Sequence, residues 1–503
     1  MDSRRLPILH PLASAVLLAL SFPPFNFFFP PFVALVPLLL FIDSERSHWR
    51  AAAGTALFGL FFWCTLIYWI TLFTKAGYLV VVLIMTSTFV AFTLVVRLFK
   101  SRFGLPLIFS APVVWTAASY IHAHGDIAFT WGQLAYSLTD WPFWLQMACV
   151  TGPYGVTAWI VAINVVIYEL ALRRPGRGRA FRYAVALALL FAVPAAFGAW
   201  RYRANEDIEA RAPKLAVSYV QPSVPQDLKW DPGLRDSTFA LLRSLSLEQA
   251  GRRPQLVVWP EAATPANLRL EPNYQGFVGD VARQLGCPLL TGSPEYRWNT
   301  AISSYDAFNS AFFFGKDGRL LDGYDKTQLV PVSERFPWED VFPALRKVEV
   351  GGSHFVPGDR YTVFHFDGEA FSVLICFESI FPQISRKFVR GGARFLVNIT
   401  NDAWFGNTSA PYQHLSMYSL RAVENRVPVI RAANTGVSAF IDVRGMIISR
   451  TGIFEKGYLK NRLETPGIDS PITFYTRFGN LFAYLCALIT SLIFAKVMFR
   501  GGT

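Results

Sequence analysis

Long apolar stretches dominate the first two fifths of the chain and return once near its end. Eight of them reach or approach the roughly 20 residues that a membrane-spanning helix requires, and they occupy residues 8–23, 27–42, 53–73, 78–97, 104–121, 153–172, 183–200 and 478–498. This pattern predicts a polytopic α-helical membrane domain of about eight transmembrane helices. Prolines divide the first two stretches, so a re-entrant hairpin remains an alternative at the start of the chain.

A different pattern begins near Pro213, where short apolar runs alternate with amphipathic segments. Runs that are apolar at nearly every position are typical of strands buried on both faces, and they occupy residues 215–221, 256–261, 288–293, 309–315, 371–378, 395–401, 427–434 and 437–443. Helical periodicity lies between several of them, at residues 234–250, 274–285, 382–391 and 411–425. The alternation predicts a layered α/β domain with a mixed sheet. Its length of roughly 260 residues is enough for a core of its own.

Composition and charge turn this division into a membrane topology. The chain is 52% hydrophobic and only 16% charged, with a net charge of +12, which is unusual for a soluble globular protein. The basic residues of the first half lie in short loops, which argues against nucleic acid as a partner. Because basic loops stay in the cytoplasm, we assign to it the loops and ends at residues 1–7, 43–50, 97–103, 173–182 and 496–503.

Eight alternating spans with these loops inside would place both termini in the cytoplasm and the α/β segment outside it. We therefore expect a transmembrane domain of seven helices at residues 1–202, an extracytoplasmic domain at 203–475, and a last transmembrane helix with a cytoplasmic tail at 476–503. The apolar run after Arg5 continues into the next without a small-residue cleavage site, so we expect an uncleaved anchor.

The predicted outer segment at residues 122–152 is rich in Trp, Phe and Tyr and contains no Lys or Arg. Such segments commonly lie at the membrane interface as an aromatic belt. A lipid-facing wall for a substrate is the alternative, and the sequence leaves both open.

The cysteines and histidines favour neither a disulfide framework nor a metal site. The five cysteines are scattered and form no CxxC pair; they are Cys64, Cys149, Cys287, Cys376 and Cys486. His354, His365 and His414 lack the spacing of metal ligands relative to other His, Cys or acidic residues. We therefore expect at least one free thiol, no metal and no cofactor.

Three residues at the carboxyl ends of predicted strands could carry out chemistry together. Glu261 follows "LVVWP", Lys326 follows the turn "DGYD", and Cys376 ends "FSVLI", which are positions where α/β sheets gather functional side chains. Singly, they could be an exposed carboxylate, a surface lysine and an inert buried thiol. Together they suffice for acyl transfer, because the carboxylate can accept the thiol proton and the ammonium can stabilise the thiolate and an oxyanion.

The motifs around these residues carry a family resemblance. "WPE", "YDKTQLVPVSE" and "CFE", in this order, resemble the carbon–nitrogen hydrolase (nitrilase) superfamily, whose members fold as an αββα sandwich. "NDAWFG" and "RAANTG" after the cysteine, joined to a membrane half, resemble the apolipoprotein N-acyltransferases of that superfamily along essentially the whole chain. The resemblance implies a nitrilase-like αββα domain inserted into a polytopic helical membrane domain.

The resemblance also implies roles for individual residues. It makes Glu261 the general base, Lys326 the oxyanion stabiliser, Cys376 the nucleophile and Glu334 a second essential carboxylate near the lysine. The implied substrate-binding residues include two on a mobile arm over the site, Trp404 and Phe405, and three others, Trp230, Phe377 and Glu378. Ordinary packing is the alternative for the aromatic residues.

Two positions depart from the family pattern. The family more often has Phe-Gly before the glutamate, where this chain has Val332 and Ser333, and glycine tolerates backbone angles that serine does not. Tyrosine is common after the family's cysteine, whereas Phe377 has no hydroxyl group to take part in the reaction.

The reaction that the resemblance implies is acyl transfer between membrane lipids and lipoproteins. A glycerophospholipid donates an acyl chain to Cys376, and the free α-amino group of the S-diacylglyceryl cysteine at an apolipoprotein's N-terminus accepts it. The implied location is the bacterial inner membrane with the site on the periplasmic side, and we expect a monomer. Two alternatives are a membrane-anchored amidase that acts on a small amide and an inactive lipoprotein-binding scaffold.

Overall fold

The computed structural model describes residues 6–211, 213–300, 303–342, 344–345, 354–467 and 470–500. The chain divides into two compact units. A helical unit comprises Met1–Arg203 with Phe478–Thr503, and an α/β unit comprises Ala204–Arg477. Of the ends predicted to be cytoplasmic, residues 1–5 and 501–503 lie outside the described residues.

Apolar helices make up the first unit, and each predicted apolar stretch coincides with helical structure. The helices are α1 (Leu6–Ala19), α2 (Pro30–Val33), α3 (Val36–Ser44), α4 (His48–Leu66), α5 (Lys75–Phe103), α6 (Leu107–Ile121), α7 (Pro142–Leu145), α8 (Ala148–Ala171), α9 (Arg177–Arg211) and α15 (Leu481–Arg500). In the described part of the chain, three are long and apolar enough to cross a membrane: α5, α8 and Arg177–Glu206 of α9. The count of eight spans stays a prediction.

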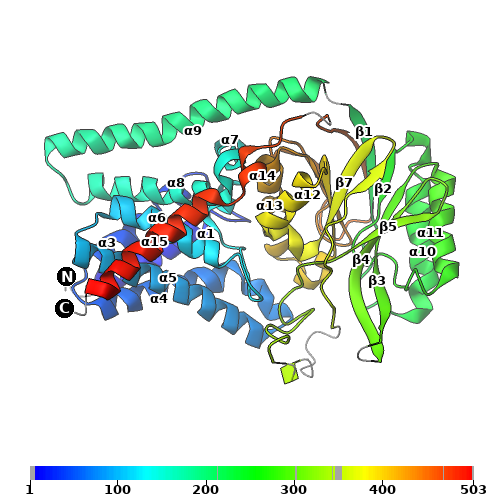
Figure 1. Cartoon of the computed structure of the whole chain (residues 1–503), viewed down its shortest axis with the longest axis horizontal. Helices are drawn as coiled ribbons and strands as arrows, with labels where there is room; N and C mark the ends of the chain where they lie inside the picture. Colours follow the sequence, from blue (N-terminus) through cyan, green and yellow to red (C-terminus); the bar gives the residue numbers. More distant parts are fainter. Residues whose placement is uncertain are drawn as a thin grey trace. The chain divides into compact units, whose positions relative to one another are not determined.

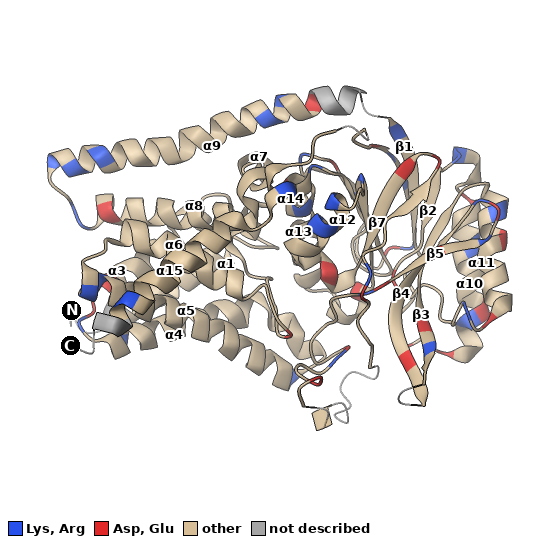
Figure 2. Cartoon of the chain, in the orientation of Figure 1, with Lys and Arg blue, Asp and Glu red and all other residues tan. Residues whose placement is uncertain are grey.

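Three of the basic loops meet at one end of the helical unit. Near the end of α5, Arg97 donates to the backbone carbonyl of Glu45 over 2.8 Å, and Lys100 pairs with Asp43. After the end of α8, Arg173 lies 3.8 Å from the same Asp43 carboxylate. Figure 2 shows blue segments at the start of α9 and near α3, on the left side of the view. Loops that the charge rule assigns to one compartment therefore lie at one end of the unit.

The aromatic segment at residues 122–152 folds back onto the helices of its own unit. Trp131 and Tyr136 are buried, and the Trp131 ring lies 4.8 Å from the Trp69 ring. These two side chains therefore pack inside the unit and do not form an interfacial belt. Trp141 remains exposed.

Two six-stranded sheets form the centre of the α/β unit. One has the order β12-β1-β2-β3-β4-β5 and the other the order β11-β10-β9-β8-β7-β6. The strands are β1 (Lys214–Gln221), β2 (Leu256–Val258), β3 (Leu289–Asn299), β4 (Ser304–Phe314), β5 (Leu320–Asp325), β6 (Phe364–Phe366), β7 (Glu369–Ile375), β8 (Phe395–Thr400), β9 (Val429–Ala433), β10 (Ala439–Ile441), β11 (Ile447–Arg450) and β12 (Gly457–Glu464).

Helices cover the outer faces of both sheets. Figure 1 shows α10 (Arg235–Leu247) and α11 (Pro272–Leu285) on one sheet, and α12 (Pro382–Arg390) and α13 (Ala410–Asn425) on the other; α14 (Phe474–Phe478) ends the unit. The sheets face each other through aromatic contacts, such as the Phe313 and Phe371 rings 5.3 Å apart. The predicted nitrilase-like sandwich of two sheets between helices is confirmed.

The strands that the sequence did not predict are short or half-exposed. Two of these, β11 and β12, bury few of their residues, so no continuous apolar run marks them. The predicted buried strands include two parallel sets, β1-β2-β3 and β7-β8-β9. Parallel strands end at the same edge of a sheet, and the residues after β2, β7 and β8 are brought together there.

Candidate active site

Glu261 follows β2 and is buried among hydrogen-bond donors. One carboxylate oxygen accepts a hydrogen bond from Asn309 Nδ2 and the other from the Asn401 backbone N–H, each over 2.8 Å. Burial raises the pKa of Glu261, although the Lys326 ammonium opposes this. A carboxylate with a raised pKa holds an abstracted proton better, which suits a general base. Gly292 of β3 packs against the backbone of Glu261. A Cβ atom at position 292 would lie only 2.7 Å from the Glu261 Cα, so a larger residue there would displace Glu261.

Lys326 follows β5 directly and points at two carboxylates. Its Nζ donates to Glu334 Oε1 over 2.8 Å and lies 3.8 Å from Glu261 Oε1. Burial by itself would lower the pKa of Lys326, but its acidic neighbours, chiefly Glu334, outweigh burial and raise the pKa. The lysine is therefore a permanent cation, and its separation from Glu261 exceeds a hydrogen-bond distance.

A tight turn positions Glu334 on the lysine. The Glu334 Oε2 atom accepts from the Val330 backbone N–H over 2.8 Å. Val332 has a φ of +67°, a conformation that is unfavourable for a β-branched residue. The strained backbone is therefore at Val332 and not at Ser333, where the sequence comparison with glycine had raised the question. Despite this strain, the turn brings the Glu334 carboxylate to Lys326.

Cys376 stands where β7 ends and a short 3-10 helix, Cys376–Ile380, begins. Its φ of +50° is in the left-handed region, a strained geometry that is common at functional sites. Burial and the Glu261 charge raise the pKa of the Cys376 thiol, while Lys326 lowers it by a smaller amount. The resting thiol is therefore protonated, and a base must remove its proton during the reaction.

Glu378 lies two residues after the cysteine and is fully buried. Its Oε1 accepts from the Tyr324 hydroxyl over 2.6 Å and from the Thr327 backbone N–H over 2.7 Å. Its Oε2 accepts from the Ile375 backbone N–H over 2.8 Å. The carboxylate thus ties the strand that carries Cys376 to the loop after Lys326. These contacts favour a positioning role over the predicted contact with substrate.

Two of the predicted aromatic residues line a groove of about 690 Å³. Trp230 and Trp404 are half-exposed in it. Gln226 also lines the groove and accepts from Asn401 Nδ2 over 2.7 Å, and the Asn401 backbone in turn contacts Glu261. The groove wall is therefore linked to Glu261 through Asn401.

The other two aromatic residues are placed differently. Phe377 is buried against Phe381, with ring centroids 5.1 Å apart. Phe405 lies with its ring 6.4 Å from the ring of His414. Among the residues that the structure describes, the groove is lined by Trp230 and Trp404 but not by Phe377 or Phe405.

Family models and related proteins match most of the chain. The family model for carbon-nitrogen hydrolase matches residues 217–469, and the model for the apolipoprotein N-acyltransferase N-terminal domain matches residues 14–166. An apolipoprotein N-acyltransferase from Geobacter metallireducens is 35% identical over 96% of this chain and 94% of its own length. The chain belongs to the apolipoprotein N-acyltransferase family. It is an N-acyltransferase built on the carbon–nitrogen hydrolase fold.

One further relative and one solved structure are also similar to this chain. An apolipoprotein N-acyltransferase from Chlorobaculum tepidum is 31% identical over 97% of this chain and 96% of its own. Among solved structures, an amidase from Nesterenkonia sp. is 20% identical with a TM-score of 0.39, and the match covers 52% of this chain and 94% of the amidase.

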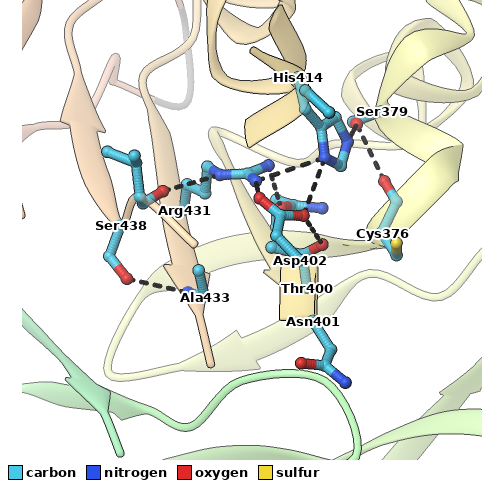
Figure 3. Close-up of polar contacts among 12 residues, drawn as sticks. Cys376, Ser379, Thr400, Asn401, Asp402, His414, Arg431, Ala433 and Ser438 are labelled. Carbon is cyan, nitrogen blue, oxygen red and sulfur yellow. Dashed lines mark hydrogen bonds and ion pairs between the residues drawn. The ribbon is translucent and has the colours of Figure 1, made fainter. Parts of the chain in front are cut away.

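A buried ionic network of this N-acyltransferase lies behind the cysteine (Figure 3). Asp402 pairs with Arg431 and lies 3.2 Å from His414 Nδ1. The His414 Nε2 atom lies 3.0 Å from the Ser379 hydroxyl, which donates to the Cys376 backbone carbonyl over 2.9 Å. The network therefore supports the strained backbone of Cys376 from the side of α13.

The charge states within the network follow from its contacts. Burial alone would raise the pKa of Asp402, but Arg431 and His414 lower it to about 2. Burial, together with the Arg431 charge, lowers the pKa of His414. At neutral pH the network is therefore an Asp402–Arg431 ion pair with a neutral imidazole. His414 was expected not to bind a metal, and no local pattern in the sequence indicated this network.

Lys229 is a second buried residue that the sequence analysis missed. Its side chain is almost fully buried, and Nζ donates to the backbone carbonyl of Glu261 over 3.0 Å. The sequence signal was weak, because Lys229 follows no strand and precedes the exposed Trp230.

Proposed function

We propose that this N-acyltransferase moves an acyl chain from a glycerophospholipid, through a thioester on Cys376, to the α-amino group of the N-terminal S-diacylglyceryl cysteine of apolipoproteins. The proposal rests chiefly on one observation: Glu261 and the Lys326–Glu334 ion pair converge beside a protonated thiol. Family membership supports the acceptor, and the apolar helices support a lipid donor.

In the first half-reaction, the Cys376 sulfur attacks the ester carbonyl carbon of the phospholipid while Glu261 takes the thiol proton. Lys326 and the backbone N–H of Phe377 stabilise the oxyanion that forms. When the C–O bond breaks, Glu261 gives its proton to the departing alkoxide. The products are a lysophospholipid and a thioester on Cys376.

In the second half-reaction, Glu261 takes a proton from the incoming ammonium, and the amine nitrogen attacks the thioester carbonyl carbon. The C–N bond forms, the C–S bond breaks, and a second proton from nitrogen passes to the Cys376 thiolate. Glu261 then releases its proton to solvent. No cofactor is needed, because the ester already supplies an activated acyl group.

Glu334 and the groove residues support these steps. Glu334 fixes the Lys326 ammonium through its hydrogen bond of 2.8 Å, so the cation is in place before charge develops. Trp230 and Trp404 offer apolar area at a groove linked to Glu261, and we assign them to substrate contact. Phe377, Phe405 and Glu378 act through packing and positioning at the same site.

We extend the proposal to the membrane. Eight helices cross the bacterial inner membrane, residues 203–475 are periplasmic, and the protein acts as a monomer. The shared end of the basic loops supports this orientation. A reporter that is active only outside the cytoplasm, fused at about residue 460, is expected to be active. Activity of a cytoplasm-only reporter at that site would contradict the orientation.

Transfer of a labelled acyl chain tests the reaction. The full-length protein is incubated with acyl-labelled phospholipid and a peptide that begins with S-diacylglyceryl cysteine; the same peptide with an acetylated amine is the matched control. We expect label on the free-amine peptide only, and none with Cys376→Ser. Release of labelled fatty acid without labelled peptide would favour a hydrolase. Ammonia release from a small amide would favour the amidase alternative, and peptide binding without turnover would favour a scaffold.

A further inference from the structure

Lys229 lies beside the site, yet the proposed reaction does not use it. Its exposed fraction is 3%, and its Nζ has the Glu261 carbonyl at 3.0 Å and the Trp230 ring centroid at 5.9 Å. A buried ammonium is strongly unfavourable unless negative charge surrounds it. A carbonyl and an aromatic ring provide only partial charges, so the surrounding carboxylates must account for its position.

The charges around Cys376 are unbalanced without Lys229. Glu261 and Glu334 share the single ammonium of Lys326, and Glu378 is a further carboxylate held by uncharged donors. In the network on the other side, Asp402 and Arg431 cancel each other, and the lowered pKa of His414 leaves the imidazole neutral. The phenol of Tyr418 is neutral because burial raises its pKa. Beside Glu261, Lys229 therefore offsets part of the remaining negative charge.

The hydrogen bond from Lys229 also fixes the backbone at Glu261. The next residue, Ala262, has a φ of +46°, which L-amino acids rarely adopt. The Lys229 ammonium holds the carbonyl between these two residues in its orientation. A change of the carbonyl direction would move the Glu261 carboxylate relative to the thiol.

We propose that Lys229 is a positioning residue for acyl transfer, whose charge favours the Cys376 thiolate and whose hydrogen bond orients Glu261. The inference rests on the proposed roles of Glu261 and Cys376. Burial lowers the pKa of Lys229 to about 8, with Glu261 and Cys376 opposing that shift. Its charge is therefore present at neutral pH and is lost at moderately alkaline pH.

Alkylation of Cys376 by iodoacetamide tests the charge without any lipid, so the result does not depend on the proposed acyl donor. The full-length protein, Lys229→Gln and Lys229→Met are compared from about pH 6 to about pH 10, and peptide mapping follows each cysteine. Lys229→Gln is the matched variant, because its amide can still donate to the Glu261 carbonyl but has no charge. Cys287, buried in the same unit, is the internal control for folding, because it should stay unlabelled in all three proteins.

We expect both variants to alkylate Cys376 about tenfold more slowly than the wild type at neutral pH. The difference should close above about pH 9, where Lys229 in the wild type is itself neutral. In the wild type alone, the rate should rise by less than tenfold per pH unit around pH 8, which gives a test that needs no variant. The proposal would be overturned if Lys229→Gln alkylated Cys376 at the wild-type rate at every pH, or if the rates of the two proteins differed by the same factor at every pH. A full tenfold rise of the wild-type rate per pH unit around pH 8 would overturn it as well.

Discussion

Two charged clusters flank Cys376, and they are made of similar residue types. Glu261, Lys326 and Glu334 form the first cluster; Asp402, His414 and Arg431 form the second. In the second cluster, Arg431 makes further hydrogen bonds to Tyr418 over 2.7 Å and to the Val437 carbonyl over 2.9 Å. In the first, Lys326 stands 3.8 Å from Glu261. The first cluster can accept new partners, whereas the second is already satisfied.

This difference separates chemistry from support. A buried network whose members are all hydrogen-bonded is rigid and specifies one geometry, which is what a strained residue such as Cys376 needs behind it. A proton acceptor and an oxyanion stabiliser must instead change partners during the reaction. The same carboxylates and cations therefore serve two purposes, and their hydrogen-bond partners decide which.

The largest expected effect is on catalysis in the first cluster. Glu261→Gln removes the proton acceptor but keeps the size of the side chain, and we expect the acyl-transfer rate to fall by about 10²- to 10⁴-fold. Thermal unfolding should shift little in comparison. The rate of labelling of the acceptor peptide and the unfolding midpoint measure the two effects. A variant with near-normal transfer would remove Glu261 from the role of base.

The second cluster should respond in stability. Arg431→Met leaves the Asp402 carboxylate buried without its cation, and we expect a loss of about 3–5 kcal/mol in the free energy of unfolding. Chemical or thermal unfolding of the full-length protein measures this loss. The double variant Arg431→Met with Asp402→Leu is the control, because it removes the stranded charge and should recover part of the loss. An unfolding curve of Arg431→Met equal to that of the wild type would show that the network gives no support.

A smaller effect concerns pH and the neutral imidazole. Because the pKa of His414 is lowered from its ordinary 6.5 in the folded state, the unfolded chain binds a proton more readily. The contribution of His414 to stability is therefore present above pH 6.5, the ordinary pKa of the imidazole, and is lost as the pH falls below that value. Asp402, with a pKa of about 2, keeps its contribution until the pH falls below about 4.

Unfolding midpoints between about pH 7 and about pH 5 test this sign. We expect the midpoint of the wild type to decline more over that range than the midpoint of His414→Gln. The difference between the two proteins isolates His414 from other titrating groups. Parallel declines would mean that the imidazole is not held neutral in the folded state.

The smallest effect concerns backbone strain in the first cluster. Val332→Gly relieves a φ of +67° at a β-branched residue, and we expect a gain of about 1 kcal/mol in the free energy of unfolding. Val332→Ala is the matched control, because it shortens the side chain without the conformational freedom of glycine. Equal effects of the two substitutions would place the change in side-chain packing and not in the backbone.

The sequence predicted the parts of the fold and site that leave a local signal. Continuous apolar runs marked the buried parallel strands. Glu261 and Cys376, at the ends of two predicted strands, converge in the structure with Lys326, which follows the turn "DGYD". The charge pattern indicated loops that lie together in the structure. Half-exposed strands such as β12 gave no such run and were missed.

Residues whose role depends on distant partners could not be predicted from local patterns. Lys229 contacts Glu261 across 32 positions of sequence, and Arg431 pairs with Asp402 across 29. Glu378 accepts from Ile375 nearby, but its other donors, from Tyr324 to Gln328, lie about 50 positions earlier. Such pairings arise only when the sheets bring separate strands together.

The central claim is that Cys376 carries the acyl chain between two half-reactions. Mass spectrometry of the full-length protein, incubated with phospholipid and no acceptor, tests it most directly. We predict a single acyl adduct that maps to Cys376, is released by hydroxylamine as expected for a thioester, and is absent from Cys376→Ser and Glu261→Gln. An acyl adduct on Cys376→Ser at the wild-type level, or none on the wild type while transfer to the peptide proceeds, would contradict the account.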